Sequence, residues 1–426
     1  MDRNEKVTRA ATFVLTLLSL GVASHGQPSM AQSAGTFTAT GSMIAHRAAH
    51  TATLLPNGKV LIAGGRSIGL GGGGPVWAGT ELYDPTTGAF SSTRDMTTSR
   101  WLHTATLLPN GKVLIAGGMS GSNYALASAE IYDPSTGTFA ATGHMHRARH
   151  RHTATLLNDG KVLIAGGALT DFSNSSLASA ELYDSSTGVF ISTGDMNRAR
   201  FAHTATLLGD GTVLIDSSHP ESEETGSSEG YNPLTGTFNL IGRTTDGGAE
   251  TATLLINGKV LVTRTSEGAI CCVELYDPST GAFAPTGEMV RMANQFTATL
   301  IPDGTVLIAG GYPFGESLLY DPVTGMFSPA GSMGIFRRWH TATLLSNGAV
   351  LIVGGYDTAV ATSQAMLGDP VSLNSAQLYT PTVLAPSPVL FPLSGDGQGP
   401  GVIVHAGTDQ VVSPNNPAVG WRGRSR

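Results

Sequence analysis

Disulfide bonds cannot stabilise this fold, because the 426-residue chain has only two cysteines, Cys271 and Cys272, and these are adjacent in the sequence. Adjacent cysteines either form a strained disulfide with each other or remain as two thiols at the start of a strand, and the sequence leaves both alternatives open. A chain with so few cysteines must be held together by strand pairing and by its hydrophobic core.

Charge is also scarce. Only 13% of the residues are charged, the formal net charge is -7, and no run of basic residues occurs. Because nucleic acids and anionic membrane surfaces are bound by clustered Lys and Arg, this composition argues against both as partners. A protein or a carbohydrate is the expected partner, and no cofactor is predicted.

Long apolar runs are missing as well. The uncharged stretch from Ala10 to Ala23 is too short to span a membrane, and it follows Arg3, Lys6 and Arg9. This arrangement is typical of a signal peptide. We expect residues 1–31 to be a signal peptide, cleaved after Ser24 or after Ala31, and the mature chain to be secreted, periplasmic or on the cell surface without membrane insertion.

Repetition, in contrast, is abundant. A phrase of about 50 residues occurs seven times, a period that is typical of propellers and solenoids. Its fullest form reads His-Thr-Ala-Thr-Leu-Leu-Pro-Asn-Gly-Lys-Val-Leu-Ile-Ala-Gly-Gly and then Ala-Glu-Leu-Tyr-Asp-Pro-x-Thr-Gly-x-Phe. Each copy predicts four strands, the first two joined by a glycine-containing hairpin turn. We therefore predict an all-β, seven-bladed propeller over residues 35–381.

The two ends of the repeat region predict how the ring closes. The seventh copy stops after Tyr379 without the turn that leads to a fourth strand, whereas an orphan fourth strand, residues 35–41, precedes the first copy. The N-terminal strand should complete the last blade, which removes exposed sheet edges. The Pro- and Gly-rich tail, residues 382–426, is too short for an independent core, and we interpret it as a truncated C-terminal domain or a disordered appendage.

The double glycine after the second strand, the tyrosine of the third strand and the Gly-x-Met after the fourth resemble kelch repeats, in the branch related to galactose oxidase. The resemblance implies a copper radical oxidase, which would need two Tyr and two His around one copper and a Tyr cross-linked to a Cys. Here Trp339-His340 stands where a Tyr-His pair is implied, so only His340 corresponds. We therefore expect no catalysis of this type, and fold alone does not fix function.

The two faces of the predicted ring differ. The first-to-second and third-to-fourth turns, all short, share one face, which we call the short-turn face. The long second-to-third loops and the fourth-to-first connections share the other, the irregular face, where binding is expected. Five histidines recur at the start of the innermost strand on this face, each three residues after an arginine: His50, His103, His152, His203 and His340. Either they satisfy groups at the blade junctions or they converge on a metal.

The sequence departs from the repeat consensus at neighbouring positions of blades 4 to 6. Asp216 and Arg264 fall where other copies have Ala-Gly-Gly, and Glu250 and Phe296 replace the ring histidine. Together with His219 these residues are candidate lining of a pocket for a polar ligand, although drift in a tolerant repeat would explain the same changes. We predict a non-catalytic ligand-binding or protein-interaction module. The alternatives are a galactose-oxidase-like carbohydrate-active enzyme and a structural role in a cell-surface assembly, which would show an exposed apolar or aromatic patch and no pocket.

Overall fold

A computed structural model describes twelve segments of the chain, all within the unit Ala34–Arg426: residues 35–68, 74–122, 124–170, 175–216, 227–243, 248–265, 272–289, 294–312, 316–357, 371–382, 404–406 and 410–412. The predicted signal peptide, His219, Cys271 and most of the tail lie outside these segments. No helix in them is long and apolar enough to cross a membrane.

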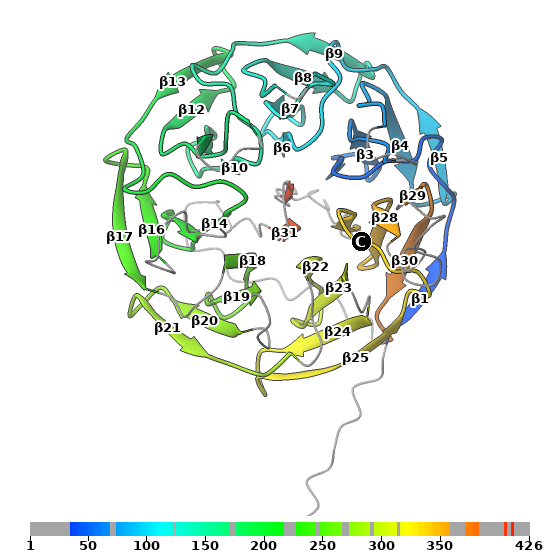
Figure 1. The fold of residues 1–426 in the computed structure, drawn as a ribbon. Helices are drawn as coiled ribbons and strands as arrows, with labels where there is room; N and C mark the ends of the chain where they lie inside the picture. Colours follow the sequence, from blue (N-terminus) through cyan, green and yellow to red (C-terminus); the bar gives the residue numbers. More distant parts are fainter. Residues whose placement is uncertain are drawn as a thin grey trace, which may run out of the picture. The chain divides into compact units, whose positions relative to one another are not determined.

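The described residues form seven four-stranded antiparallel blades arranged in a ring, which confirms the predicted all-β propeller (Figure 1). Blades 1 to 3 contain β2 (Thr51–Leu54), β3 (Val60–Ala63), β4 (Thr80–Asp84), β5 (Ala89–Ser92), β6 (Thr104–Leu107), β7 (Val113–Ala116), β8 (Ala129–Asp133), β9 (Thr138–Ala141), β10 (Thr153–Leu156), β11 (Val162–Ala165), β12 (Ala180–Asp184) and β13 (Val189–Ser192). Blades 4 to 6 contain β14 (Thr204–Leu207), β15 (Val213–Asp216), β16 (Ser227–Asn232), β17 (Thr237–Arg243), β18 (Gly248–Leu254), β19 (Val260–Thr265), β20 (Val273–Asp277), β21 (Ala282–Pro285), β22 (Asn294–Leu300), β23 (Val306–Tyr312), β24 (Glu316–Asp321) and β25 (Met326–Ser332). Blade 7 contains β26 (Thr341–Leu344), β27 (Val350–Val353), β30 (Ala376–Thr380) and β1 (Thr36–Ala39).

The N-terminal strand closes the ring. β1 pairs antiparallel with β30 in the register Thr36↔Thr380 to Ala39↔Gln377, so the fourth strand of blade 7 comes from the start of the repeat region. The rings of Phe37 and Tyr379 pack across this pair with their centroids 5.0 Å apart. The closure predicted from the two incomplete ends of the repeat is therefore confirmed.

Seven clusters of the hydrophobic core lie between the blades, one at each junction between neighbouring blades. The third-strand tyrosine joins each cluster, because its ring packs on the fourth-strand phenylalanine, as in the Tyr83–Phe90 pair at 4.9 Å. In five blades its hydroxyl is hydrogen-bonded to a threonine of the preceding blade, as between Tyr83 and Thr40 at 2.9 Å. Each blade is thus stabilised mainly by its neighbours, and the ring depends on being closed.

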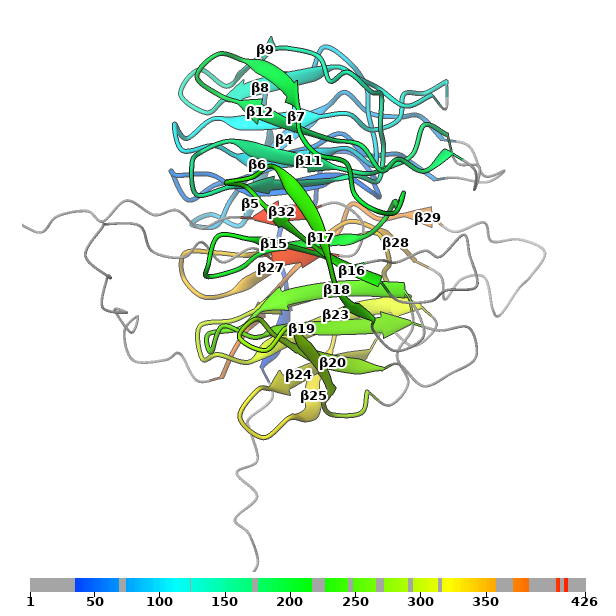
Figure 2. The same cartoon turned by 90° about the vertical axis from the view of Figure 1, so that its left-hand side faces the viewer.

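Blades 7, 1, 2 and 3 share a kink that blades 5 and 6 lack. In the four kinked blades the two inner strands are four residues long, and paired glycines with positive φ follow, such as Gly64 (62°) and Gly65 (94°). Beyond the kink the chain continues on the irregular face as short extensions, among them β28 (Tyr356–Asp357) and β29 (Val371–Ser372), at the right of Figure 2. In blades 5 and 6 the innermost strands, β18 and β22, are seven residues long, with a register shift between Ala249 and Thr251 in β18 and a positive φ at Gln295 in β22.

Part of the C-terminal tail lies inside the ring. β31 (Val404–Ala406) forms a hairpin with β32 (Gln410–Val412) at the centre of the ring (Figure 1). Its backbone pairs with the innermost strands of blades 5 and 6, Val404 opposite Thr253 and Ala406 opposite Thr297. The tail therefore contacts the two blades in which the ring histidine is replaced.

Candidate functional site

The ring histidines connect consecutive blades. The Nε2 atom of His103 in blade 2 is hydrogen-bonded to Oγ1 of Thr51 in blade 1 at 3.0 Å. The same bond joins His50 to Thr341 (3.1 Å), His152 to Thr104 (2.9 Å), His203 to Thr153 (3.0 Å) and His340 to Thr297 (3.2 Å). Desolvation by burial lowers the pKa of His103 well below its usual value and that of His340 to about 3. These imidazoles are neutral junction groups at pH 7.

Each histidine also requires a glycine in the preceding blade. A Cβ atom on Gly64 would lie 2.8 Å from Cε1 of His103, and the first glycine of the Ala-Gly-Gly faces the next histidine at every junction that has both. This contact explains why the glycine of one blade and the histidine of the next blade are lost together. Blade 4, which has Asp216-Ser217, precedes Glu250 of blade 5, and blade 5, which has Arg264, precedes Phe296 of blade 6.

The arginine three residues before the histidine anchors its own blade. Arg47 donates hydrogen bonds to the carboxylate of Glu81 at 2.8 Å and to the carbonyl oxygens of Gly64 and Gly79 at 2.9 and 2.7 Å. Glu81 in turn accepts the backbone N–H of Ile44 at 2.7 Å. Blades 2 to 4 repeat the buried Arg–Glu pair with Arg100, Arg149 and Arg200.

A charged group replaces these contacts at the junction of blades 4 and 5. Arg264 donates through Nη2 to Oδ2 of Asp216 at 2.5 Å and through Nε to Oε2 of Glu274 at 2.8 Å. All three side chains are buried. Burial disfavours the guanidinium, but the two carboxylates outweigh it and raise the pKa of Arg264. Glu274 occupies in blade 5 the position that Glu81 occupies in blade 1. Arg264 therefore forms with Glu274 the ion pair that Arg47 forms with Glu81.

The residues predicted to line a pocket lie as follows. Asp216 and Arg264 form the buried ion pair, and Phe296 packs inside the hydrophobic cluster between blades 5 and 6. Glu250 is partly exposed, and its carboxylate accepts the backbone N–H of Gln295. His219 is outside the described residues. The structure thus joins Asp216 to Arg264 as an ion pair, and both side chains are buried.

An aromatic cluster that the sequence did not predict lies on the irregular face of blades 7, 1 and 2. The guanidinium of Arg338 stacks over the ring of Tyr356 at 4.1 Å, and Tyr356 contacts Trp339 edge-on at 5.2 Å. The guanidinium of Arg66 covers Trp101 at 5.0 Å. The backbone N–H of Ala49 donates to the carbonyl of Trp339 at 3.0 Å, and Ala49 packs in one cluster with Trp101, which links the two stacks.

The same face also carries exposed apolar side chains. Ile44 is 64% exposed, Tyr124 68%, and Leu169 and Phe336 37% each, and all four lie on connections of the irregular face. Trp77 and Trp339 are half-buried among them. We call these six residues the aromatic patch. Three of the four tryptophans of the chain, Trp77, Trp101 and Trp339, fall on this face, and that concentration is the signal by which the sequence could have indicated it.

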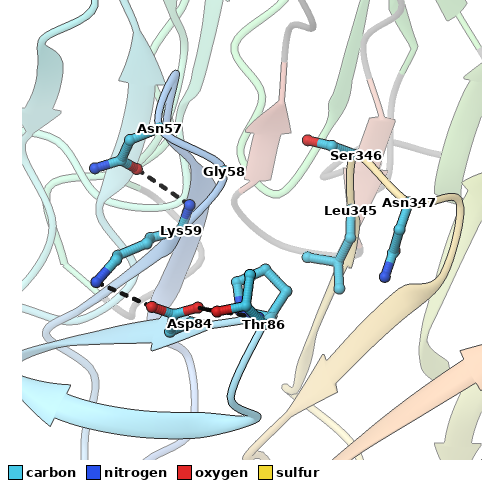
Figure 3. Close-up of a pocket in the computed structure, with 9 residues that line it drawn as sticks. Asn57, Gly58, Lys59, Asp84, Thr86, Leu345, Ser346 and Asn347 are labelled. Carbon is cyan, nitrogen blue, oxygen red and sulfur yellow. Dashed lines mark hydrogen bonds and ion pairs between the residues drawn. The ribbon is translucent and has the colours of Figure 1, made fainter.

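A cavity of about 310 Å³ lies on the opposite, short-turn face, at the junction where blade 7 meets blade 1. Its walls include Lys59, Asp84 and Thr86 from blade 1, and Leu345, Ser346 and Asn347 from blade 7 (Figure 3). Lys59 and Asp84 form an ion pair at 3.1 Å. Hydrogen bonds from Thr86, together with Lys59, lower the pKa of Asp84 to about 2, so this carboxylate is charged at neutral pH.

Comparisons with known proteins agree with this architecture. The family of the kelch motif matches residues 100–145, which span the strands of blade 2. The fold is a kelch-type β-propeller. Among solved structures it is similar to a fungal alcohol oxidase of the AA5 family in complex with copper, with a TM-score of 0.65, 15% sequence identity, and coverage of 89% of this chain and 90% of that one. No curated protein matches the chain in sequence. At this identity the likeness shows the kelch-type fold alone.

The ring histidines of this propeller are bonded at the blade junctions. Each ring histidine is buried, with Nε2 bonded to a threonine of the neighbouring blade, so the imidazoles face the junctions. Within the described segments no three His, Cys, Asp or Glu side chains lie close enough to share a metal ion. His340, which the resemblance matched to a copper ligand, is bonded to Thr297 and lies beside Trp339.

Proposed function

We propose that this kelch-type propeller is an exported, non-catalytic protein-interaction module, and that the aromatic patch on blades 7 to 3 is its contact surface. The observation that carries the proposal is the gathering of Trp77, Trp339, Tyr124 and Phe336 on one face beside the Arg338 stack. Protein interfaces are enriched in Trp, Tyr, Phe and Arg, and these residues supply most of their binding energy.

The distribution of lysine supports the same face. Lys is depleted in interfaces, because its flexible, strongly hydrated ammonium group is costly to bury. The four lysines of the described residues, Lys59, Lys112, Lys161 and Lys259, follow the first-to-second turns of the short-turn face. The cations of the aromatic cluster on the irregular face are arginines, two of which stack on aromatic rings.

Export rests on the residues that precede the propeller, Arg3, Lys6, Arg9 and the apolar stretch after them. The N-terminal sequence of the protein recovered outside the cytoplasm tests this part of the proposal. A mature chain that begins at His25 or Gln32 supports export, and a protein that keeps residues 1–31 and stays in the cytoplasm contradicts it.

Site-specific photo-cross-linking in the native host tests the contact surface. A photoreactive amino acid at Tyr124 or Phe336 should give one defined cross-linked species. Matched controls at Leu234 and Val323, which are 95% and 92% exposed on the short-turn face, should not give it. Equal cross-linking from both faces, or none from the patch, would contradict the proposal.

An alcohol oxidase is the second candidate, favoured by the fold of the structural neighbour. It predicts that Cu²⁺ raises the melting temperature of the purified propeller and that primary alcohols then yield peroxide. We expect neither, because the ring histidines, including His340, are bonded to threonines at the blade junctions. Peroxide formation that is lost in His340→Ala would replace our proposal.

A further inference from the structure

The short-turn face carries a wedge at three of the blade junctions. The residue after Leu-Leu in the first-to-second turn packs over the turn glycine of the next blade. Pro56 lies 3.3 Å from where a Cβ of Gly111 would be, Pro109 lies 3.6 Å from that of Gly160, and Pro302 lies 3.3 Å from that of Gly348. A proline ring thus fills each of these junctions.

At two other junctions Asn158 and Ile256 take the place of the proline. The position is empty at two junctions: between blades 4 and 5, where the equivalent residue is Gly209, and where the ring closes. In blade 7 the equivalent residue is Ser346, and no atom lies within 4 Å of where a Cβ of Gly58 in blade 1 would be. The hydroxymethyl group is too small to reach across, and the cavity of about 310 Å³ occupies the space (Figure 3). Ligand sites begin at about 300 Å³, so the cavity suits a small ligand. We call it the closing gap.

The walls of the closing gap present both hydrogen-bond acceptors and hydrogen-bond donors. Asp84 is held as an anion by Thr86, whose hydroxyl donates to it at 2.6 Å, and by Lys59. On the opposite wall, Oδ1 of Asn347 accepts the N–H of Ala349 at 3.1 Å, which leaves its amide N–H groups as the donors. Pro85 and Leu345 add apolar surface between the two walls.

This combination selects the chemistry of the ligand. The carboxylate of Asp84 and the ammonium of Lys59 neutralise each other, so a ligand with net charge of either sign gains nothing from entering. A hydroxyl group can donate to Asp84 and accept from Asn347 or Ser346, and carbon-bound hydrogens can pack on Pro85 and Leu345. We propose that the closing gap binds one neutral sugar unit, independently of the protein-interaction surface on the other face.

The repeat itself supplies the test variants. Ser346→Pro places at the closing junction the residue that copies 1, 2 and 6 already tolerate, so it should fill the gap without unfolding the blade. Asn347→Asp keeps the oxygen that accepts the Ala349 N–H but removes the amide donors, and copies 3, 4 and 6 have Asp here. Pro109→Ser opens the junction of blades 2 and 3 and is the matched control.

The experiment is saturation-transfer NMR of the purified propeller with D-glucose, D-galactose, D-mannose and N-acetyl-D-glucosamine, each titrated to 50 mM. At least one sugar should bind, Ser346→Pro and Asn347→Asp should each weaken its binding at least tenfold at unchanged melting temperature, and Pro109→Ser should bind it as the parent does. No saturation transfer from any of the four sugars would overturn the proposal. So would binding that Ser346→Pro leaves intact, because the sugar would then occupy another place.

Discussion

At the residue scale, the junctions of this propeller are built from a group of three residues that spans two blades. A threonine and a glycine of one blade hold the histidine of the next, the threonine by a hydrogen bond and the glycine by leaving room for the ring. The sequence shows all three residues in every intact copy, but periodicity cannot tell which copy supplies the partner. The assignment to neighbouring blades needed the structure.

The histidine–threonine bond can be tested with a pair of threonines in equivalent positions. Thr51→Val removes the partner of His103 Nε2 and leaves a buried imidazole nitrogen without its bond, at an expected cost of about 1–3 kcal/mol of unfolding free energy. Thr204→Val is the control, because blade 5 has no histidine and Thr204 Oγ1 has no hydrogen-bond partner. Urea unfolding of both variants measures the difference, and equal losses would contradict the role of the bond.

Arg264 is the residue on which the junction between blades 4 and 5 depends. Arg264→Gly restores the consensus glycine but leaves Asp216 and Glu274 buried without a counter-charge, which typically costs about 3–5 kcal/mol. Arg94→Gly, at an exposed position, should change stability by only about 0.5 kcal/mol. If unfolding by urea shows similar small losses for both variants, the ion-pair group does not stabilise the junction.

The same residues show why the sequence could not decide between a pocket and drift in blades 4 to 6. The changes at Asp216, Arg264, Glu250 and Phe296 are visible in the sequence, but a charged residue in a repeat looks the same whether it faces a ligand or another charge. In the structure Arg264 stands at the glycine position of its blade and pairs with Asp216 and Glu274. It therefore replaces the arginine that pairs with the glutamate in other blades. The aromatic patch was missed for a related reason, because Trp77, Trp101 and Trp339 occupy non-equivalent positions and so do not repeat.

At the scale of elements, most of the fold was predictable. The hairpin glycines, the third-strand tyrosines and the incomplete ends of the repeat fixed the strand count, the blade count and the closure by β1. The difference in inner-strand length between these blades was not predicted, because blade 6 keeps Gly310 and Gly311 with positive φ and yet has seven-residue inner strands. Paired glycines therefore permit the kink but do not impose it.

The closing strand gives the prediction that belongs to this scale. A chain that begins at Gly41 lacks β1, exposes the edge of β30 and loses the Phe37–Tyr379 contact, so we expect it to lose about 3 kcal/mol or more and to aggregate. A chain that begins at Gln32 keeps β1 and serves as the control. Thermal unfolding and light scattering compare the two chains, and equal melting temperatures would mean that β1 does not close the ring.

At the scale of the whole molecule, the ring histidines couple the stability of every regular junction to pH. Burial lowers the pKa of His50, His103, His152 and His340 below the value of 6.5 that an exposed imidazole has. The unfolded chain therefore takes up protons first as the pH falls. Stability from these groups is complete above about pH 6.5 and is lost progressively toward the folded-state pKa, which for His340 is about 3.

The slope of the unfolding free energy against pH distinguishes this mechanism from general acid denaturation. Between pH 6.5 and 5, above the range in which ordinary carboxylates titrate, each buried imidazole should remove up to about 1.4 kcal/mol of unfolding free energy per pH unit. His103→Gln removes one titrating group, so its slope should be smaller than that of the parent chain by about that amount. Urea unfolding across this range measures both slopes. A stability that stays constant from pH 7 to pH 5 would mean that the imidazoles accept protons in the folded ring, which their burial between blades argues against.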